Sequence, residues 1–139
     1  SNYIDVRNDP LYPFGFGLSY TTFEYGKPRL SGTTMTVGGK LSLTVNVKNT
    51  GKYDADEVVQ LYIRDLAASI SRPVKELKGF QKIALAPGET KTVDFCITLK
   101  DLQFFDEATH AWKAEPGKFK AYIGASELDI RAIVPFTLK

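Results

Sequence analysis

The feature that most constrains this chain is an alternation of apolar and polar residues with a period of two. In residues 41–48 the sequence reads Leu-Ser-Leu-Thr-Val-Asn-Val-Lys, with every odd position apolar and every even position polar. Successive side chains of a strand point to opposite faces, so this pattern predicts a strand with one buried and one solvated face. The same pattern predicts strands at residues 57–65, 92–99, 119–123 and 128–138, and weaker signals predict two more at 22–30 and 76–85.

The alternation also assigns each strand an inner and an outer face. In residues 57–65 we expect Val59, Leu61 and Ile63 to point inward and Val58, Gln60, Tyr62 and Arg64 to point outward. Cys96 falls on the outer face of its strand, and Leu128 is expected among the inward residues of the last strand.

Turn-forming residues separate the predicted strands. Residues 86–89 read Ala-Pro-Gly-Glu, and proline at the second position with glycine at the third is typical of a type II turn. Residues 115–118, Glu-Pro-Gly-Lys, predict a second such turn, and residues 37–40 predict a further break. Residues 99–108 are the one stretch suited to a helical turn, where we expect a crossover between two sheets. About seven strands in 139 residues indicate one all-β domain, a β-sandwich of the immunoglobulin type.

Composition excludes several classes of function. The net charge is +2, from 18 basic and 16 acidic residues spread along the chain, so no dense basic cluster indicates a nucleic-acid partner. No apolar run approaches the roughly 20 residues that a membrane-spanning helix needs, and we expect no membrane contact. The single cysteine, Cys96, excludes an internal disulfide and a cysteine-based zinc site. No phosphate-binding or dinucleotide-binding glycine motif is present, so we expect no cofactor.

No set of side chains predicts catalysis. Asp54, Asp56 and Glu57 fit an acid pair or a calcium site in principle, but the spaced pattern of a calcium loop is missing and a solvated loop is the favoured interpretation. Asp101, Asp106 and Glu107 are expected to cap or fix the crossover. His110 is expected in an exposed loop without a catalytic partner. We therefore predict no catalytic, cofactor-binding or metal-binding residue.

The first 21 residues differ from the rest. Residues 9–20 contain two prolines, two glycines and four aromatic residues, and neither strand nor helix periodicity fits them. We predict an extended arm over residues 1–21, of which Ser1 and Asn2 are compatible with a vector-derived remnant, followed by the sandwich at 22–139. Large aromatic side chains are costly to leave in water, so the arm needs a surface to lie on. The candidate domain-docking residues of the arm are Tyr12, Phe14, Phe16 and Tyr20.

Several short motifs, in order, resemble the C-terminal fibronectin type III-like domain of family 3 glycoside hydrolases. Each is weak alone, but their order and spacing extend over residues 10–138. The motifs are Pro-Leu-Tyr-Pro-Phe-Gly-Phe-Gly-Leu-Ser-Tyr at 10–20, Val-Lys-Asn-Thr-Gly at 47–51, Asp-Glu-Val-Val-Gln-Leu-Tyr at 56–62, Lys-Glu-Leu-Lys-Gly-Phe at 75–80, Leu-Ala-Pro-Gly-Glu at 85–89 and Ile-Gly-Ala-Ser at 123–126. Glu127 departs from the family, which often has a second serine there.

The resemblance implies a fibronectin III-like fold and a non-catalytic accessory function. In the family, the nucleophilic aspartate lies in an upstream barrel and the acid/base residue in the following α/β domain, and neither motif occurs here. The implied partners are these two domains of the same parent chain, a retaining β-glucosidase or β-xylosidase that is periplasmic or secreted. The domain would pack on them, stabilise them, and lend the loop at residues 66–73 to the active-site rim. The candidate rim residues are Ile70 and Arg72.

Two alternative functions remain open from the sequence. A carbohydrate-binding module would bind an oligosaccharide by stacking it on Trp112, the candidate sugar-stacking residue, together with exposed tyrosines at 53, 62 and 122. It requires at least two exposed, coplanar rings. An adhesion or scaffold sandwich is the other alternative, because this architecture serves many functions.

Overall fold

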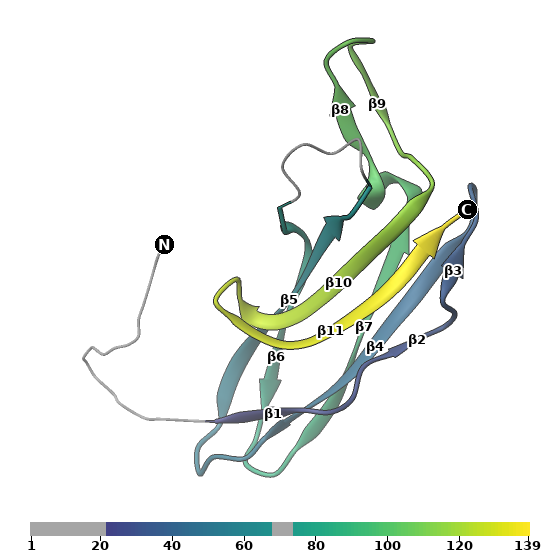
Figure 1. Ribbon diagram of the computed structural model, residues 1–139. Helices are drawn as coiled ribbons and strands as arrows, with labels where there is room; N and C mark the ends of the chain where they lie inside the picture. The colour runs from purple at the N-terminus through teal and green to yellow at the C-terminus, as the bar shows by residue number, and fades with distance from the viewer. Residues whose placement is uncertain (1–21, 68–73) are drawn as a thin grey trace.

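The computed structural model describes residues 22–67 and 74–139, which form two β-sheets packed face to face (Figure 1). The four-stranded sheet, sheet A, has β4 (Lys40–Asn49) paired with β1 (Phe23–Tyr25), β2 (Arg29–Leu30) and β7 (Thr90–Thr98). The five-stranded sheet, sheet B, has the order β3 (Thr34–Met35), β11 (Asp129–Leu138), β10 (Gly117–Ser126), β5 (Ala55–Asp65) and β6 (Glu76–Leu85). The all-β sandwich is confirmed, and six of the predicted strands are found as single strands, whereas the one expected at 22–30 is divided into β1 and β2.

The predicted alternation builds the core between the sheets. The inner faces of β4, β5, β7 and β10 supply its buried rows, which are Leu41, Leu43, Val45 and Val47; Val59, Leu61 and Ile63; Val93, Phe95 and Ile97; and Phe119, Ala121 and Ile123. The rings of Phe119 and Phe136 stack with their centroids 5.5 Å apart. Each buried Val, Leu, Ile or Phe side chain stabilises the fold by roughly 1.5–3 kcal/mol relative to exposure, so these rows hold the domain together.

The turn predictions are confirmed at one proline-glycine pair and wrong at the other. The Glu89 N–H donates to the Ala86 carbonyl at 2.9 Å and Gly88 has φ of 78°, as a type II turn requires. Gly117 instead has φ of 149° and already pairs with Leu138 as the first residue of β10. The residues before β10 belong to a separate two-stranded ribbon at 104–113 and not to a neighbouring strand of sheet B. The chain therefore does not have to reverse its direction within the sheet at Gly117.

The β10–β11 hairpin corrects the expected place of Leu128. The pairing register shifts between Ile123 and Gly124 and again between Gly124 and Ser126, and Leu128 lies exposed in the turn that follows. Gly124 permits this irregularity, because a Cβ atom there would lie 2.2 Å from the Asp129 carbonyl oxygen. Leu128 precedes the first residue of β11, so the alternation of that strand does not set the direction of its side chain.

One end of the sandwich, the turn end, is closed by a buried asparagine. The Asn49 Nδ2 atom donates to the carbonyls of Tyr53 at 2.8 Å and Leu85 at 2.9 Å, and its Oδ1 accepts from the Gly51 N–H at 2.8 Å. The Gly88 N–H also donates to the Asn49 carbonyl at 2.8 Å. Asn49 thereby joins the β4–β5 loop to the β6–β7 turn, which explains why an asparagine follows the alternating run at 41–48.

The opposite end, the hairpin end, carries the segment predicted as a crossover. A 3₁₀ helix, η2 (Leu99–Leu102), follows β7, as expected for a helical turn in this stretch. The chain then forms β8 (Phe104–Asp106) and β9 (Ala111–Lys113), a two-stranded ribbon that projects beyond the sandwich (Figure 1). The sequence gives no alternation long enough to predict this ribbon.

Candidate functional site

The β8–β9 ribbon is held in shape by Asp106. Its Oδ1 accepts from the Ala108 N–H at 3.2 Å, and its Oδ2 accepts from the Thr109 hydroxyl at 3.0 Å and pairs with Lys113 Nζ at 3.0 Å. The bond from Lys113, then that from Thr109, lowers the pKa of the Asp106 carboxyl. His110 completes the turn with φ of 52°, in the left-handed region. The predicted role of Asp106 in fixing this segment is confirmed, and His110 is exposed as expected.

Trp112 lies on β9 directly across from Phe105 and is 64% exposed. The two ring centroids are 5.5 Å apart and the ring planes meet at 73°, an edge-to-face contact. Phe105 also meets the His110 ring edge-on, at 6.0 Å. The exposed aromatic rings of the ribbon therefore form a corner, which offers one sugar-sized face on Trp112 and no coplanar pair.

The tyrosines expected to extend such a platform do not join it. Tyr62 and Tyr122 point outward on neighbouring strands, but they are only 8% and 6% exposed, so the expected exposure is wrong. The Tyr62 hydroxyl donates to Gln60 Oε1, and Lys75 Nζ lies 5.3 Å from the Tyr122 ring centroid. Tyr53 is exposed, but it lies in the β4–β5 loop at the other end of the sandwich.

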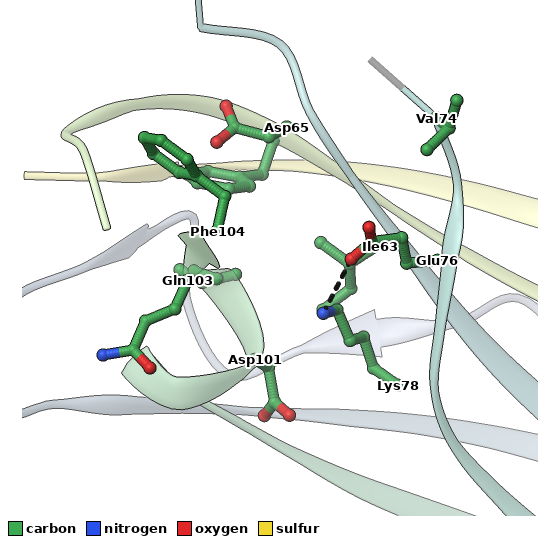
Figure 2. Close-up of a pocket in the computed structure, with 10 residues that line it drawn as sticks. Ile63, Asp65, Val74, Glu76, Lys78, Asp101, Gln103 and Phe104 are labelled. Carbon is green, nitrogen blue, oxygen red and sulfur yellow. Dashed lines mark hydrogen bonds and ion pairs between the residues drawn. The ribbon is translucent and has the colours of Figure 1, made fainter. Parts of the chain in front are cut away.

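A small crevice opens beside the base of the ribbon. Figure 2 shows Glu76 and Lys78, 3.0 Å apart, on one wall and residues of the η2 segment on the other. The crevice is lined by Ile63, Asp65, Val74, Glu76, Lys78, Asp101, Leu102, Gln103, Phe104 and Phe119. Its volume is about 70 Å³. Small-molecule sites usually occupy roughly 300–1,000 Å³, so the crevice has room for a few water molecules and not for a sugar ring.

The carboxylates around the crevice serve local structure. Asp101 Oδ2 accepts from the Thr98 N–H at 2.8 Å and from its hydroxyl at 3.3 Å, which confirms the predicted capping of the crossover. Asp65 Oδ1 accepts from the Ala67 N–H at 2.8 Å, whereas its buried Oδ2 has no hydrogen-bond partner among the described residues. Burial, with the charge of Glu115 as a lesser cause, raises the pKa of Asp65. Asp65 is the one crevice carboxylate left with a buried, unpaired oxygen.

The acidic residues at 54–57 do not form a cation site. Glu57 turns to Tyr25, whose hydroxyl donates to Glu57 Oε2 at 2.9 Å, and Asp56 Oδ2 pairs with Lys82 Nζ at 3.4 Å. Within residues 22–67 and 74–139, no group of three or more His, Cys, Asp or Glu side chains is placed to hold a metal ion. Cys96 lies exposed on the outer face of β7, as its position in the alternation predicts.

The other predicted site residues fall outside the described part of the chain. These are the arm residues Tyr12, Phe14, Phe16 and Tyr20 and the rim residues Ile70 and Arg72. They remain predictions, as does the boundary between residues 21 and 22. Among the described residues, no helix has the length and apolar character needed to cross a bilayer.

Comparison with known proteins agrees with the fold and with the order of motifs. The fibronectin type III-like domain family matches residues 57–127, and the chain belongs to that family. It is 57% identical over 134 residues to a β-glucosidase of Bacteroides ovatus and 48% identical over 131 residues to a β-xylosidase of Formosa agariphila. A solved β-glucosidase from Erythrobacter marinus superposes with a TM-score of 0.80 at 40% identity, covering 100% of this chain.

The chain matches a small part of each of these hydrolases. The region aligned with the Bacteroides ovatus enzyme is 96% of this chain and 18% of that enzyme. For the Formosa agariphila enzyme the shares are 94% and 18%. The solved structure gives the same share, 18%. The chain taken alone therefore corresponds to a fibronectin-type domain of such hydrolases and not to a whole glycoside hydrolase.

Proposed function

We propose that this chain is a non-catalytic accessory domain of a family 3 glycoside hydrolase, a periplasmic or secreted retaining β-glucosidase or β-xylosidase. The observation that carries the proposal is the match to a Bacteroides ovatus β-glucosidase, 57% identical over 96% of this chain and 18% of that enzyme. A domain that recurs as a small part of longer hydrolases acts through its contact with the rest of the chain. Its function is to pack on the catalytic domains and stabilise them.

The geometry of the described residues supports a non-catalytic role. A retaining glycosidase places two carboxyl groups roughly 5–5.5 Å apart on either side of a bound sugar. Here the crevice beside the ribbon has a volume of about 70 Å³, and the carboxylates of Glu76 and Asp101 already bind Lys78 and Thr98. Asp65 is the third carboxylate of the crevice and keeps one oxygen unpaired among the described residues, so the crevice lacks the second free carboxylate that this chemistry requires.

Deletion of the domain from its parent enzyme tests the proposal. Removal of residues 10–139 is expected to lower the thermal midpoint of the parent by about 5 °C or more, or to reduce its soluble yield severely, because the catalytic domains lose a stabilising contact. The point variant Val37→Thr in the intact parent, at an exposed side chain, is the control for a change that leaves the domain in place. A parent enzyme that keeps its yield, midpoint and activity after the deletion would defeat the proposal.

The finer part of the proposal assigns Ile70 and Arg72 to the active-site rim. Arg72→Ala in the parent is then expected to raise KM several-fold while kcat stays nearly constant, since a rim residue contributes binding and not chemistry. Arg29→Ala, which changes an exposed arginine on β2 of sheet A, is the matched control. Equal kinetics in Arg72→Ala and the wild type would remove the loop from the rim.

A second candidate function, glycan binding, is favoured by the exposure of the Trp112 ring. Trp112 is the single tryptophan of the chain, so its fluorescence reports one site. Titration with laminari-, cello- and xylo-oligosaccharides is expected to give saturable quenching with one sugar class if the ring stacks on a sugar face. A flat trace with all three, confirmed by calorimetry, would leave the accessory role alone.

A further inference from the structure

The outer faces of the two sheets differ in character, and the outer face of sheet A is polar. Its side chains on β4 and β7 are Ser42, Thr44, Asn46, Thr92, Asp94 and Cys96. Two cross-strand pairs satisfy one another there: Thr44 donates to Asp94 at 2.8 Å, and Thr92 donates to Asn46 at 2.8 Å. This face exposes polar side chains to water, so β4 and β7 leave no apolar surface there that a partner would have to cover.

The outer face of sheet B carries an apolar row across four strands. Ile133 pairs with Tyr122, Tyr122 with Tyr62, and Tyr62 with Leu77. Phe80 lies on the next outward position of β6, opposite Gln60. At the margins of the row, Ile133, Leu77 and Phe80 are 53%, 50% and 64% exposed. We call this surface the outer patch; it consists of Tyr62, Leu77, Phe80, Tyr122 and Ile133.

The centre of the outer patch is held rigidly. Tyr62 and Tyr122 form a nearly buried floor between the exposed margins, because the Tyr62 hydroxyl is bound to Gln60 and the Lys75 ammonium lies over the Tyr122 ring. Lys75 Nζ also donates to the Glu127 carbonyl at 3.2 Å, which fixes the β10–β11 turn beside the patch. A preformed aromatic surface loses little conformational entropy when it binds.

A basic group borders the patch on the side of the hairpin end. Lys120 lies opposite Arg64 on the next outward rung, and Lys118 follows on β10. None of these three cations forms an ion pair with another described residue. The Nε atom of Arg64 is buried and has no hydrogen-bond partner in the described structure. An apolar patch with unpaired cations along one side fits a partner surface with an apolar centre and carboxylates on the matching side.

We infer that the outer patch is the surface by which this domain docks on the remainder of its parent chain. The inference rests on the proposed accessory function and adds which face is used and what the partner surface looks like. The partner is intramolecular because the relatives carry this domain as about 18% of a longer chain, so a covering surface is always tethered nearby. The polar face of sheet A then faces solvent.

The test compares three variants in the parent enzyme and in the chain alone. Leu77→Thr with Phe80→Thr removes apolar surface from the outer patch while it keeps residues that favour strands. Val37→Thr is the matched control, an exposed apolar residue in the turn before β4. Lys120→Glu reverses one charge of the basic border. The readouts are the thermal midpoint and the rate of proteolytic release of the domain.

The inference predicts that the Leu77→Thr, Phe80→Thr double variant and Lys120→Glu each speed proteolytic release in the parent by about tenfold, a change in the docking equilibrium of about 1.4 kcal/mol, while Val37→Thr does not. In the chain alone, all three are expected to unfold within a few degrees of the wild type, since the changed side chains are exposed. The effect of Lys120→Glu is expected to shrink at high salt.

Other outcomes separate the inference from the function on which it rests. In one such outcome, deletion of the domain destabilises the parent while the Leu77→Thr, Phe80→Thr double variant and Lys120→Glu leave its proteolytic release unchanged. In that case another face docks and the inference is wrong. If deletion is inert as well, the accessory function itself fails. If the isolated chain is a dimer that Phe80→Thr dissociates while the parent is unaffected, the patch binds a second copy, and the inference is again overturned.

Discussion

The two ends of the sandwich differ in how fully their polar groups are hydrogen-bonded within the domain. Each end must satisfy the backbone groups that leave the sheets, because buried polar groups without partners cost free energy. At the turn end, Asn49 is buried, and both polar atoms of its side chain form hydrogen bonds, with Tyr53, Leu85 and Gly51. That end is complete within the domain.

The hairpin end keeps groups that the domain does not match internally. Within residues 22–67 and 74–139, the buried Asp65 Oδ2 has no hydrogen-bond partner, and Trp112 on the projecting ribbon is 64% exposed. The crevice beside Asp65 has a mixed lining, in which Glu76, Lys78 and Asp101 are the charged neighbours. The difference predicts that substitutions at the turn end cost more stability than substitutions at the tip of the hairpin end.

The largest effect is expected at the turn end. Asn49→Leu removes three side-chain hydrogen bonds of a fully buried residue and leaves the buried Leu85 carbonyl without this partner, so the free energy of unfolding is expected to fall by about 3 kcal/mol. Urea denaturation of the chain measures it. The control Asn46→Leu loses one exposed bond to Thr92 and is expected to cost under about 1 kcal/mol. Equal losses in both variants would show that Asn49 does not close this end.

A smaller effect is expected where the hairpin end meets the core. Asp101→Ala removes the bonds from Thr98 that start η2, and about 1 kcal/mol of unfolding free energy is expected to be lost. Asp94→Ala, which loses an exposed bond from Thr44 on the outer face of sheet A, is the matched aspartate control and is expected to change stability by less than about 0.5 kcal/mol. A loss at Asp101 as large as that at Asn49 would remove the contrast between the two ends.

The sequence predicted the strands because their alternation is long and each has one buried face. Residues 41–48 and 92–99 have unbroken alternation, and β4 and β7 follow it almost residue for residue. The capping role of Asp101 was also predictable, since an acidic residue three positions into a helical turn binds the N–H that precedes it.

The features of the candidate site were less accessible to sequence reasoning. The β8–β9 ribbon has three residues in each strand, too few for a period to be read. Tyr62 and Tyr122 follow the outward alternation but are nearly buried, and the contact of Lys75 with the Tyr122 ring arises only in the folded arrangement. Leu128 likewise lies in an exposed turn just before β11 and not on the expected inner face. Short elements, coverage of an outer face and the ends of strands all depend on tertiary contacts.

Glu57, near the turn end, is a partly buried carboxyl whose ionisation makes the stability of the domain depend on pH. Burial raises the pKa of Glu57, while the Tyr25 bond and the Arg131 charge oppose that rise and Asp129 adds to it. A carboxyl whose folded pKa lies above its unfolded value binds its proton more tightly when folded, so its contribution favours the fold at low pH and is lost as the pH rises above 4.5 through the raised value. Glu57→Gln has no such dependence.

Urea denaturation between about pH 3.5 and about pH 7 measures this difference. The stability of Glu57→Gln relative to the wild type is expected to increase as the pH rises across that range, because the wild type alone must bury a carboxylate. Tyr25→Phe, which removes the hydroxyl that donates to Glu57, is expected to steepen the wild-type dependence. A pH dependence that is identical in all three proteins, or of opposite sign, would show that Glu57 ionises without cost in the fold.

The smallest effect is expected at the tip of the hairpin end. Trp112→Ala loses an edge-to-face contact with Phe105 and little buried area, so the free energy of unfolding is expected to change by less than about 1 kcal/mol. Phe119→Ala, which removes a buried ring that stacks on Phe136, is expected to cost about 3–5 kcal/mol in the same assay. A loss above about 2 kcal/mol in Trp112→Ala would place the ribbon in the stabilising part of the domain. A small loss leaves the Trp112 ring free to contact a glycan or the parent chain, because the fold does not depend on it.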